Sequence, residues 1–123
     1  MERSLIIKVT SGQNDPERCA QGFTVAATAL ASGVRTSLWL TGEASWFALP
    51  GRAETFELPH SAPLADLMAS LLAPDANASI TLCTQCATRR GIGSEDVLPG
   101  IRIAGSTLFV EEIMKAGAQA LVY

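Results

Sequence analysis

The stretch SLIIKVTSGQNDPE, residues 4–17, places a strand directly before the start of a helix. Residues 4–10 are nearly all apolar or β-branched, and such runs favour a parallel strand that is covered on both faces. After the strand, Asp15 can cap the free amides of a helix, and Pro16 suits the first helical position. We therefore expect a buried parallel strand, followed by a helix that extends to about Ser32.

Further strands and helices alternate along the rest of the chain. The sequence predicts strands over 34–40, 53–58 (short), 78–83 and 119–123, and an extended piece over 101–104. Between them it predicts a helical turn or lid over 46–49, a helix over 63–73 capped by Ser61 or Ala62, a short helix over 85–90, a turn over 94–97, and a helix from a Ser106 cap to Lys115. Parallel strands need right-handed crossovers, and these place helices on the faces of the sheet. We expect one α/β domain over residues 1–123.

The composition excludes several classes of protein. Apolar residues make up 48% of the chain and charged residues 17%, as in folded rather than disordered proteins. The net charge is −3 and the basic residues are scattered, whereas nucleic-acid binding requires a clustered basic face. No signal-peptide core and no apolar segment of roughly 20 residues is present. We therefore expect a cytoplasmic protein that binds neither nucleic acid nor membrane.

Three cysteines indicate thiol chemistry rather than a disulfide framework, because their number is odd and no export signal is found. Cys83 and Cys86 are spaced Cys-x-x-Cys where a strand gives way to a helix, and the helix dipole favours a thiolate there. Arg89 and Arg90 add positive charge nearby. Alternatively, Cys83 is a packed residue at the end of a strand, and the arginines only complement the end of the helix.

A metal or nucleotide site has a weaker basis in the sequence. Cys-x-x-Cys is half of a structural zinc site, but only Cys19 and His60 remain as further soft ligands, and they lie far apart. Residues 91–93 read Gly-Ile-Gly and lack the third glycine of a dinucleotide-binding motif. We expect no metal and no cofactor. In a thioredoxin fold the thiol pair follows the first strand of the domain. Here Cys83 and Cys86 follow a strand about two-thirds of the way along the chain, so a thioredoxin fold is disfavoured.

The expected ligand site lies beyond the carboxyl ends of the strands, where open parallel sheets bind their ligands. Ser11 and Gly12, residues 41–46 and residues 83–86 all follow such ends. Trp46 lies in an apolar loop, where it can wall a pocket or join an interface. We therefore include Ser11, Gly12 and Trp46 among the candidate ligand-binding residues.

Short motifs follow one another in a characteristic order along nearly the whole chain. They are Thr10-Ser11-Gly12, Asp15-Pro16-Glu17-Arg18, Leu40-Thr41-Gly42-Glu43, Leu82-Cys83, Arg90-Gly91-Ile92 and Pro99-Gly100, before a closing helix and strand. In this order and spacing the chain resembles the DsrE-like (DsrE/DsrF-like) family of small sulfur-relay proteins. The resemblance implies a three-layer α/β/α domain on a mainly parallel five-stranded sheet, assembled into homo- or hetero-oligomers. It also implies that Cys83 accepts and passes on persulfide sulfur.

The preferred hypothesis is a sulfur-relay or thiol-redox protein in which Cys83 bears the persulfide and Cys86 is a resolving or auxiliary thiol. The backbone amides after Thr84, with Arg89 or Arg90, would stabilise the anion. The alternatives are a non-catalytic oligomeric module that binds a small ligand, and a disulfide oxidoreductase that closes Cys83 onto Cys86. Whether the protein is an enzyme, a sulfurtransferase for example, stays open.

The expected partners are further copies of the chain and sulfur donor and acceptor proteins. A homo-oligomer is expected because Trp46, Phe47 and Leu49 place apolar surface in one loop.

Overall fold

Five parallel strands form the central sheet of the computed structural model, which describes residues 2–123. The strands are β1 (Ser4–Val9), β2 (Arg35–Leu40), β3 (Ala78–Cys83), β4 (Ile101–Ala104) and β5 (Ala118–Val122). Their order across the sheet is β4-β3-β2-β1-β5, and every neighbouring pair is parallel. The predicted α/β fold on a five-stranded parallel sheet is confirmed.

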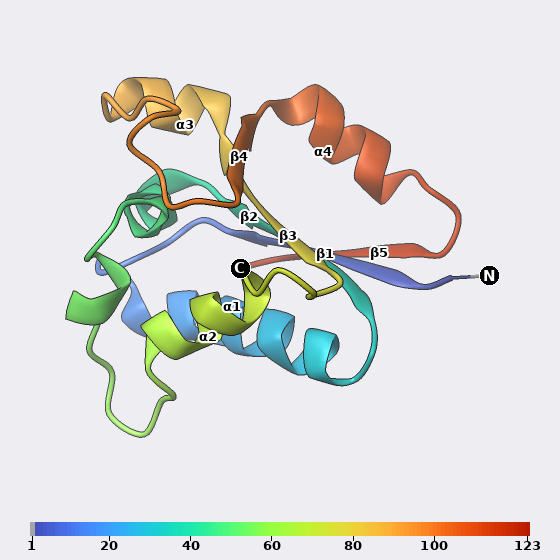
Figure 1. Ribbon diagram of the computed structural model, residues 1–123, viewed down its shortest axis with the longest axis horizontal. Coiled ribbons are helices and arrows are strands. Elements are labelled where there is room, and N and C mark those ends of the chain that lie inside the picture. Colours follow the sequence, from blue (N-terminus) through green and yellow to red (C-terminus); the bar gives the residue numbers. More distant parts are fainter. Residues whose placement is uncertain (1) are drawn as a thin grey trace.

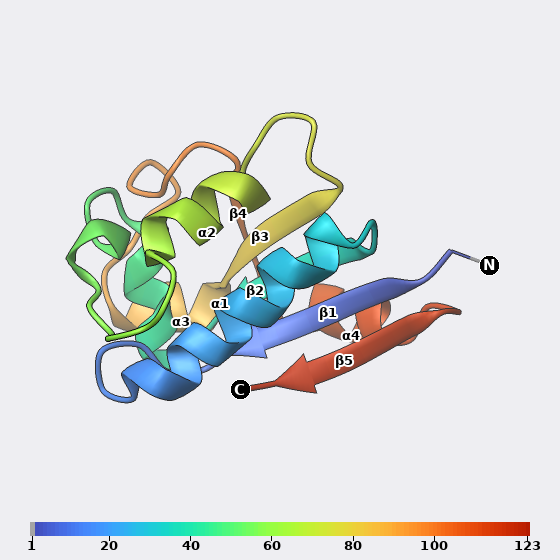
Figure 2. The same ribbon diagram turned by 90° about the horizontal axis from the view of Figure 1, so that it is seen from below.

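Helices lie on both faces of this sheet (Figure 1). The helices α1 (Pro16–Ala31) and α2 (Leu64–Leu71) cover one face, and α3 (Thr84–Arg89) and α4 (Ser106–Ile113) lie on the other. Figure 2 shows the same arrangement from below, with α1 and α2 in front of the sheet and α4 behind it. None of the helices in residues 2–123 is long and apolar enough to cross a membrane.

The first helix forms as its end signals predict. The Asp15 side chain accepts a hydrogen bond from the backbone N–H of Arg18, and Pro16 opens the helix. At the other end, Gly33 has φ +84°, a conformation that glycine adopts without a steric penalty. These local signals therefore fix both ends of α1.

The expected strand over residues 53–58 is wrong. Ala53–Thr55 forms a short 3-10 helix, η2, and Phe56 at its end is buried in the core. β2 already pairs with β1 and β3, so this segment finds no free edge beside the strand that precedes it. The residues 46–49, expected as a helical turn or lid, belong to a longer 3-10 helix, η1 (Gly42–Ala48).

Two predicted helix caps are also wrong. Pro63 precedes α2, no side chain caps the helix, and the Ser61 hydroxyl donates to the Ala62 carbonyl instead. Ser106 is the first residue of α4 rather than its cap, which is Gly105, and the helix ends at Ile113. Both differences shift a boundary by a few residues and leave the element in place.

The two faces of the sheet differ in polarity. On the face that α1 and α2 cover, the strands contribute buried apolar side chains: Ile7, Val9, Leu38, Leu40, Ile80, Leu82 and Ile101. The opposite face carries many polar ones: Ser4, Lys8, Arg35, Ser37, Ser79, Thr81 and Arg102. The first strand is buried on both faces as predicted, because Ile6 and Ile7 are 2% and 0% exposed. The sheet as a whole has one apolar face and one mixed face.

Replacing Gly22 with Ala should destabilise the protein although alanine favours helices. An added Cβ would lie 2.5 Å from Cγ2 of the fully buried Val9 and 3.4 Å from the Tyr123 ring. We expect the free energy of unfolding to fall by about 1–3 kcal/mol, as for other overpacked cores. Urea titration measures this, with Gln21→Ala at an exposed position of α1 as control. A gain of about 1 kcal/mol from helix propensity would contradict the prediction.

Candidate functional site

Three connections meet at the carboxyl ends of β1, β2 and β3. The β1–α1 loop begins at Thr10, η1 follows β2, and α3 follows β3 directly. Cys83 is the last residue of β3 and the N-cap of α3, and its side chain is half-buried. Thr84, the first residue of α3, is exposed and does not cap it with its side chain. The Cys-x-x-Cys segment therefore lies where the sequence predicts it.

The thiol of Cys86 faces the turn after β2. Cys86 is 8% exposed, and the backbone N–H of Gly42 donates a hydrogen bond to its Sγ over 3.3 Å. Gly42 has φ +52°, and a Cβ at this position would collide with the Thr10 carbonyl oxygen. Glycine is therefore required here for steric reasons, and the turn it makes brings an amide to the Cys86 sulfur.

Arg90 joins α3 to η1. Its Nε and Nη2 donate to Glu43 Oε2 over 3.2 and 2.8 Å, and its Nη1 donates to the Cys86 carbonyl over 3.2 Å. The hydrogen bond from Arg90 is the main reason that the pKa of Glu43 lies below its ordinary value. The donors of Arg90 are thus directed at a carboxylate and a carbonyl, whereas Arg89 is exposed in the last turn of α3.

Trp46 forms the wall of a small cavity of about 60 Å³ beside this network. The guanidinium of Arg52 lies over its ring at 4.8 Å and that of Arg90 at 5.9 Å, both within the range of cation–π attraction. Phe47 is 2% exposed, so most of the loop that was expected to supply apolar surface packs inward instead. Trp46 itself is half-buried.

Neither Ser11 nor Gly12 is among the residues that line this cavity. An added Cβ on Gly12 would lie 2.7 Å from the Glu43 carbonyl oxygen, so the β1–α1 loop packs tightly against η1. Ser11 is buried, and its hydroxyl has no hydrogen-bond partner within residues 2–123. The structure therefore brings Cys86, Glu43 and Arg90 into one network, and Gly12 packs against the backbone of Glu43.

Cys19 is chemically distinct from the other two cysteines. It is 0% exposed within α1, and burial raises the pKa of its thiol to about 12, with a further contribution from the Asp15 carboxylate. All three cysteines are free. In the described part of the chain, no three His, Cys, Asp or Glu side chains converge as a metal site would require.

Sequence reasoning placed residues 41–46 at this edge of the sheet but did not single out Gly42 or Glu43 as members of the site, and it missed Arg52. Gly42 carried a usable signal, because a glycine between a strand end and a helical turn often adopts positive φ. The pairing of Glu43 with Arg90 spans 47 positions and gives no local signal. The approach of Arg52 to Trp46 depends on how the chain folds back after η1.

Comparison with known proteins identifies the family and the fold. The model of the DsrE/DsrF-like family matches residues 3–122. The crystal structure of the ychN protein from E. coli superposes with a TM-score of 0.76 at 17% identity, over 100% of both chains. A protein of unknown function, MTH1491 from Methanobacterium thermoautotrophicum, gives a TM-score of 0.70 at 11% identity, over 99% of this chain and 100% of that one. No curated protein matches the sequence.

We predict that Cys83 alkylates faster than Cys19 at neutral pH, by at least about tenfold, because the thiolate is the reacting form and Cys19 is buried as the thiol. Iodoacetamide labelling of the folded protein, followed by peptide mass mapping, gives the rate at each cysteine. In denaturant the two rates should converge, which serves as the control. Equal rates in the folded protein would remove the chemical basis of the site.

Proposed function

The chain belongs to the DsrE/DsrF-like family, and from this premise we propose that it is a sulfur-relay protein that carries persulfide sulfur on Cys83. The position of Cys83 supports the proposal: the residue is half-buried at the carboxyl end of a parallel strand and directly precedes a helix. Ligands of open parallel sheets bind at this edge. The proposed setting is the cytoplasm, with a donor protein and an acceptor protein as partners.

In the loading step, the Cys83 thiolate attacks the outer sulfur of a persulfide on the donor. A new sulfur–sulfur bond forms on Cys83, the donor's sulfur–sulfur bond breaks, and the donor leaves as a thiolate. In the unloading step, an acceptor thiolate attacks the outer sulfur on Cys83 and restores the Cys83 thiolate. Both steps are thiol exchanges without net oxidation, so the relay needs no cofactor.

Cys86 gives the site a second possible outcome. If its thiolate attacks the inner sulfur of the Cys83 persulfide, hydrosulfide leaves and a Cys83–Cys86 disulfide remains. In the structure the Cys86 sulfur accepts a hydrogen bond from Gly42 and is almost inaccessible, so this attack requires the thiol to move out of its contact. We assign Cys86 the role of a resolving thiol that acts slowly.

The relay is tested by exposing the protein to glutathione persulfide and measuring its intact mass. The wild type should gain one sulfur atom, which peptide mapping should place on Cys83. Cys83→Ser should gain none, and Cys86→Ser should keep the sulfur longer. Cys19→Ala is the matched control and should load like the wild type.

Two results would change these assignments. Loading of the Cys83→Ser variant at Cys86 would mean that the two roles are reversed. Absence of loading in the wild type, with Cys83 intact and reduced, would favour a ligand-binding module in which the cysteines are incidental.

The protein is further proposed to act as a homo-oligomer. Within residues 2–123, the large apolar side chains that are exposed are Val110, Met114 and Val122, at 50%, 75% and 64% exposure. Two of them lie on or just after α4, and Val122 lies on β5. Apolar surface of this kind marks association sites when its members are contiguous.

Light scattering at micromolar concentration should therefore give a mass of more than one chain. Met114→Glu should shift it towards the monomer, because a carboxylate in an apolar contact must lose its hydration. Gln21→Glu, on the opposite side of the sheet in α1, should leave the mass unchanged. A monomeric wild type would contradict the proposal.

A further inference from the structure

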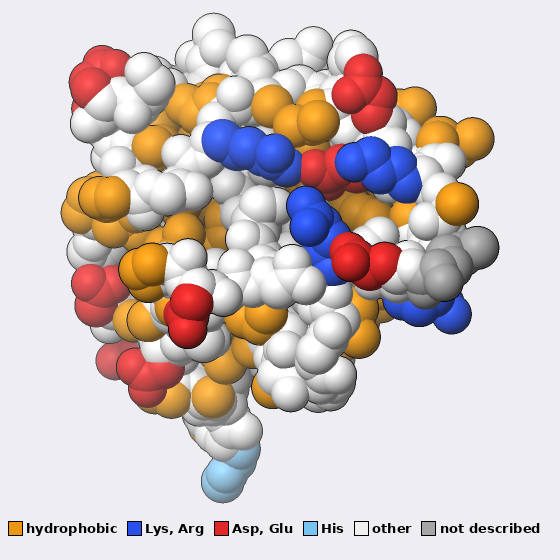
Figure 3. Space-filling view, turned by 45° about the vertical axis from the view of Figure 1, so that its right-hand side comes forward, with side chains coloured by type: hydrophobic (Ala, Val, Ile, Leu, Met, Phe, Trp, Pro, Cys, Tyr) orange, Lys and Arg blue, Asp and Glu red, His pale blue; other side chains and the backbone are white. Residues whose placement is uncertain are grey.

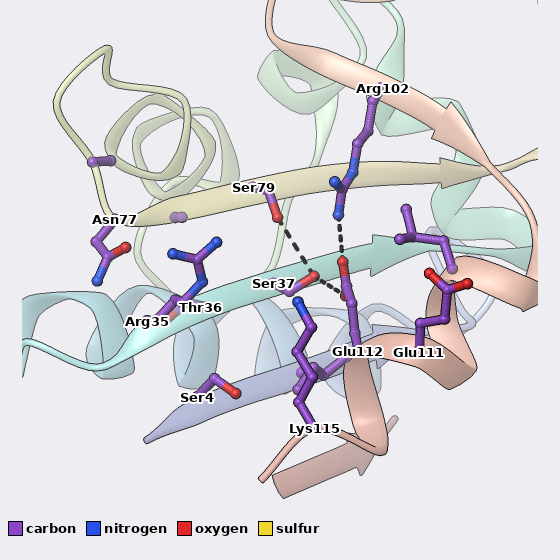
Figure 4. A pocket seen from close by; sticks show the side chains of 14 residues that line it. Ser4, Arg35, Thr36, Ser37, Asn77, Ser79, Arg102, Glu111, Glu112 and Lys115 are labelled. Carbon is purple, nitrogen blue, oxygen red and sulfur yellow. Dashed lines mark hydrogen bonds and ion pairs between the residues drawn. The ribbon is translucent and has the colours of Figure 1, made fainter. Parts of the chain in front are cut away.

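A second and larger cavity lies at the opposite ends of the strands from the cysteines. It has a volume of about 340 Å³, enough for one small organic molecule. Its floor is the mixed face of the sheet over the first halves of β1, β2 and β3, and one side of α4 forms its wall (Figure 4). On β3, the distance from Ala78 to Cys83 corresponds to about 16 Å of extended chain, so the two sites are separate.

The wall of the cavity contains a fixed polar network around Glu112. One carboxylate oxygen, Oε1, accepts hydrogen bonds from the Ser37 hydroxyl over 2.6 Å and the Trp39 indole N–H over 3.0 Å. The other accepts from Arg102, which also donates to the Thr81 hydroxyl. Burial acts to raise the pKa of Glu112, but the bonds from Ser37, Trp39 and Arg102 outweigh it, so the pKa lies below its ordinary value. Glu112 is therefore ionised, and Arg102 balances its charge.

Two other cations line the same cavity without a partner. Arg35 begins β2, and Lys115 follows α4. Both side chains are exposed, and neither makes a hydrogen bond or an ion pair with another residue in the range 2–123. Figure 3 shows basic side chains gathered around acidic ones on this side of the molecule. Since Arg102 balances Glu112, Arg35 and Lys115 are opposed only by Glu111, and the lining keeps one net positive charge for a ligand.

The chemistry of the lining suits a phosphate group attached to a hydroxylated body. A phosphate monoester carries a charge of about −1.5 to −2 at neutral pH, so the two cations Arg35 and Lys115 attract it, and its oxygens fit the fork of an arginine. The remaining lining includes hydroxyl and amide groups of Ser4, Ser79 and Asn77. Glu111 also lines the cavity; it repels a phosphate but accepts hydrogen bonds from hydroxyl groups.

We propose that this cavity binds a small hydroxylated phosphate monoester, with its phosphate held by Arg35 and Lys115. The hydroxyl groups of the ligand are bound by the polar lining and by Glu111. The site goes beyond the proposed sulfur relay, because it shares no residue with the network around Cys86.

Isothermal titration calorimetry with ribose 5-phosphate as the probe tests the site. We expect saturable binding of ribose 5-phosphate, weaker binding of inorganic phosphate and none of ribose. Arg35→Gln and Lys115→Gln should each weaken the binding of ribose 5-phosphate by about tenfold, the usual effect of losing a charge-assisted hydrogen bond. Arg18→Gln removes an equal charge from α1, on the other side of the sheet, and should leave the affinity unchanged.

Several results would overturn the proposal. These are no saturable binding of ribose 5-phosphate at millimolar concentration, an equal loss in Arg18→Gln, or an Arg35→Gln variant that binds normally but has an altered oligomeric mass. The last result would assign the cavity to a contact between subunits. Cys83→Ser should bind ribose 5-phosphate like the wild type, so a failure of sulfur loading and a failure of this site are distinguishable.

Discussion

The parallel direction of all five strands is the constraint on which the rest of the structure depends. Each parallel strand must be reached by a crossover, and the crossovers bring the connections after β1, β2 and β3 to one edge of the sheet. At that edge, Gly42 lies so close to the Thr10 carbonyl that no side chain fits. This close packing lets a backbone amide reach the Cys86 sulfur, and Arg90 then joins α3 to η1 through Glu43.

The elements that the sequence predicts well are those with signals inside their own residues. The ends of α1 are an example: Asp15 caps the helix, Pro16 is its first residue, and Gly33 lies beyond its end with positive φ. Residues 53–58 have strand-like composition, but whether they pair depends on a free sheet edge nearby. That edge is absent because β2 already has two neighbours, a fact that no local pattern contains.

The candidate site was predictable in position and only partly in its contacts. A Cys-x-x-Cys after a strand places Cys83 at the edge of the sheet, and the structure has it there. Arg89 and Arg90 are visible in the sequence as positive charge near the cysteines, but the two hydrogen bonds from Arg90 to Glu43 have no local signal. Such pairs join residues distant in sequence, and their partners become known only when the chain is folded.

The mixed face of the sheet has a signal in the sequence of the strands themselves. Polar Ser79 and Thr81 alternate with apolar residues along β3, whereas β2 begins with three polar residues, Arg35, Thr36 and Ser37. A period of two indicates a face that is not filled with apolar side chains, even in a parallel sheet. The charge of Glu112 can lie against this face only because Ser37, Trp39 and Arg102 replace the water that it loses. Removing any one of these donors would leave part of that desolvation uncompensated, so the polar network and the open cavity beside it both depend on the polar side chains of this face.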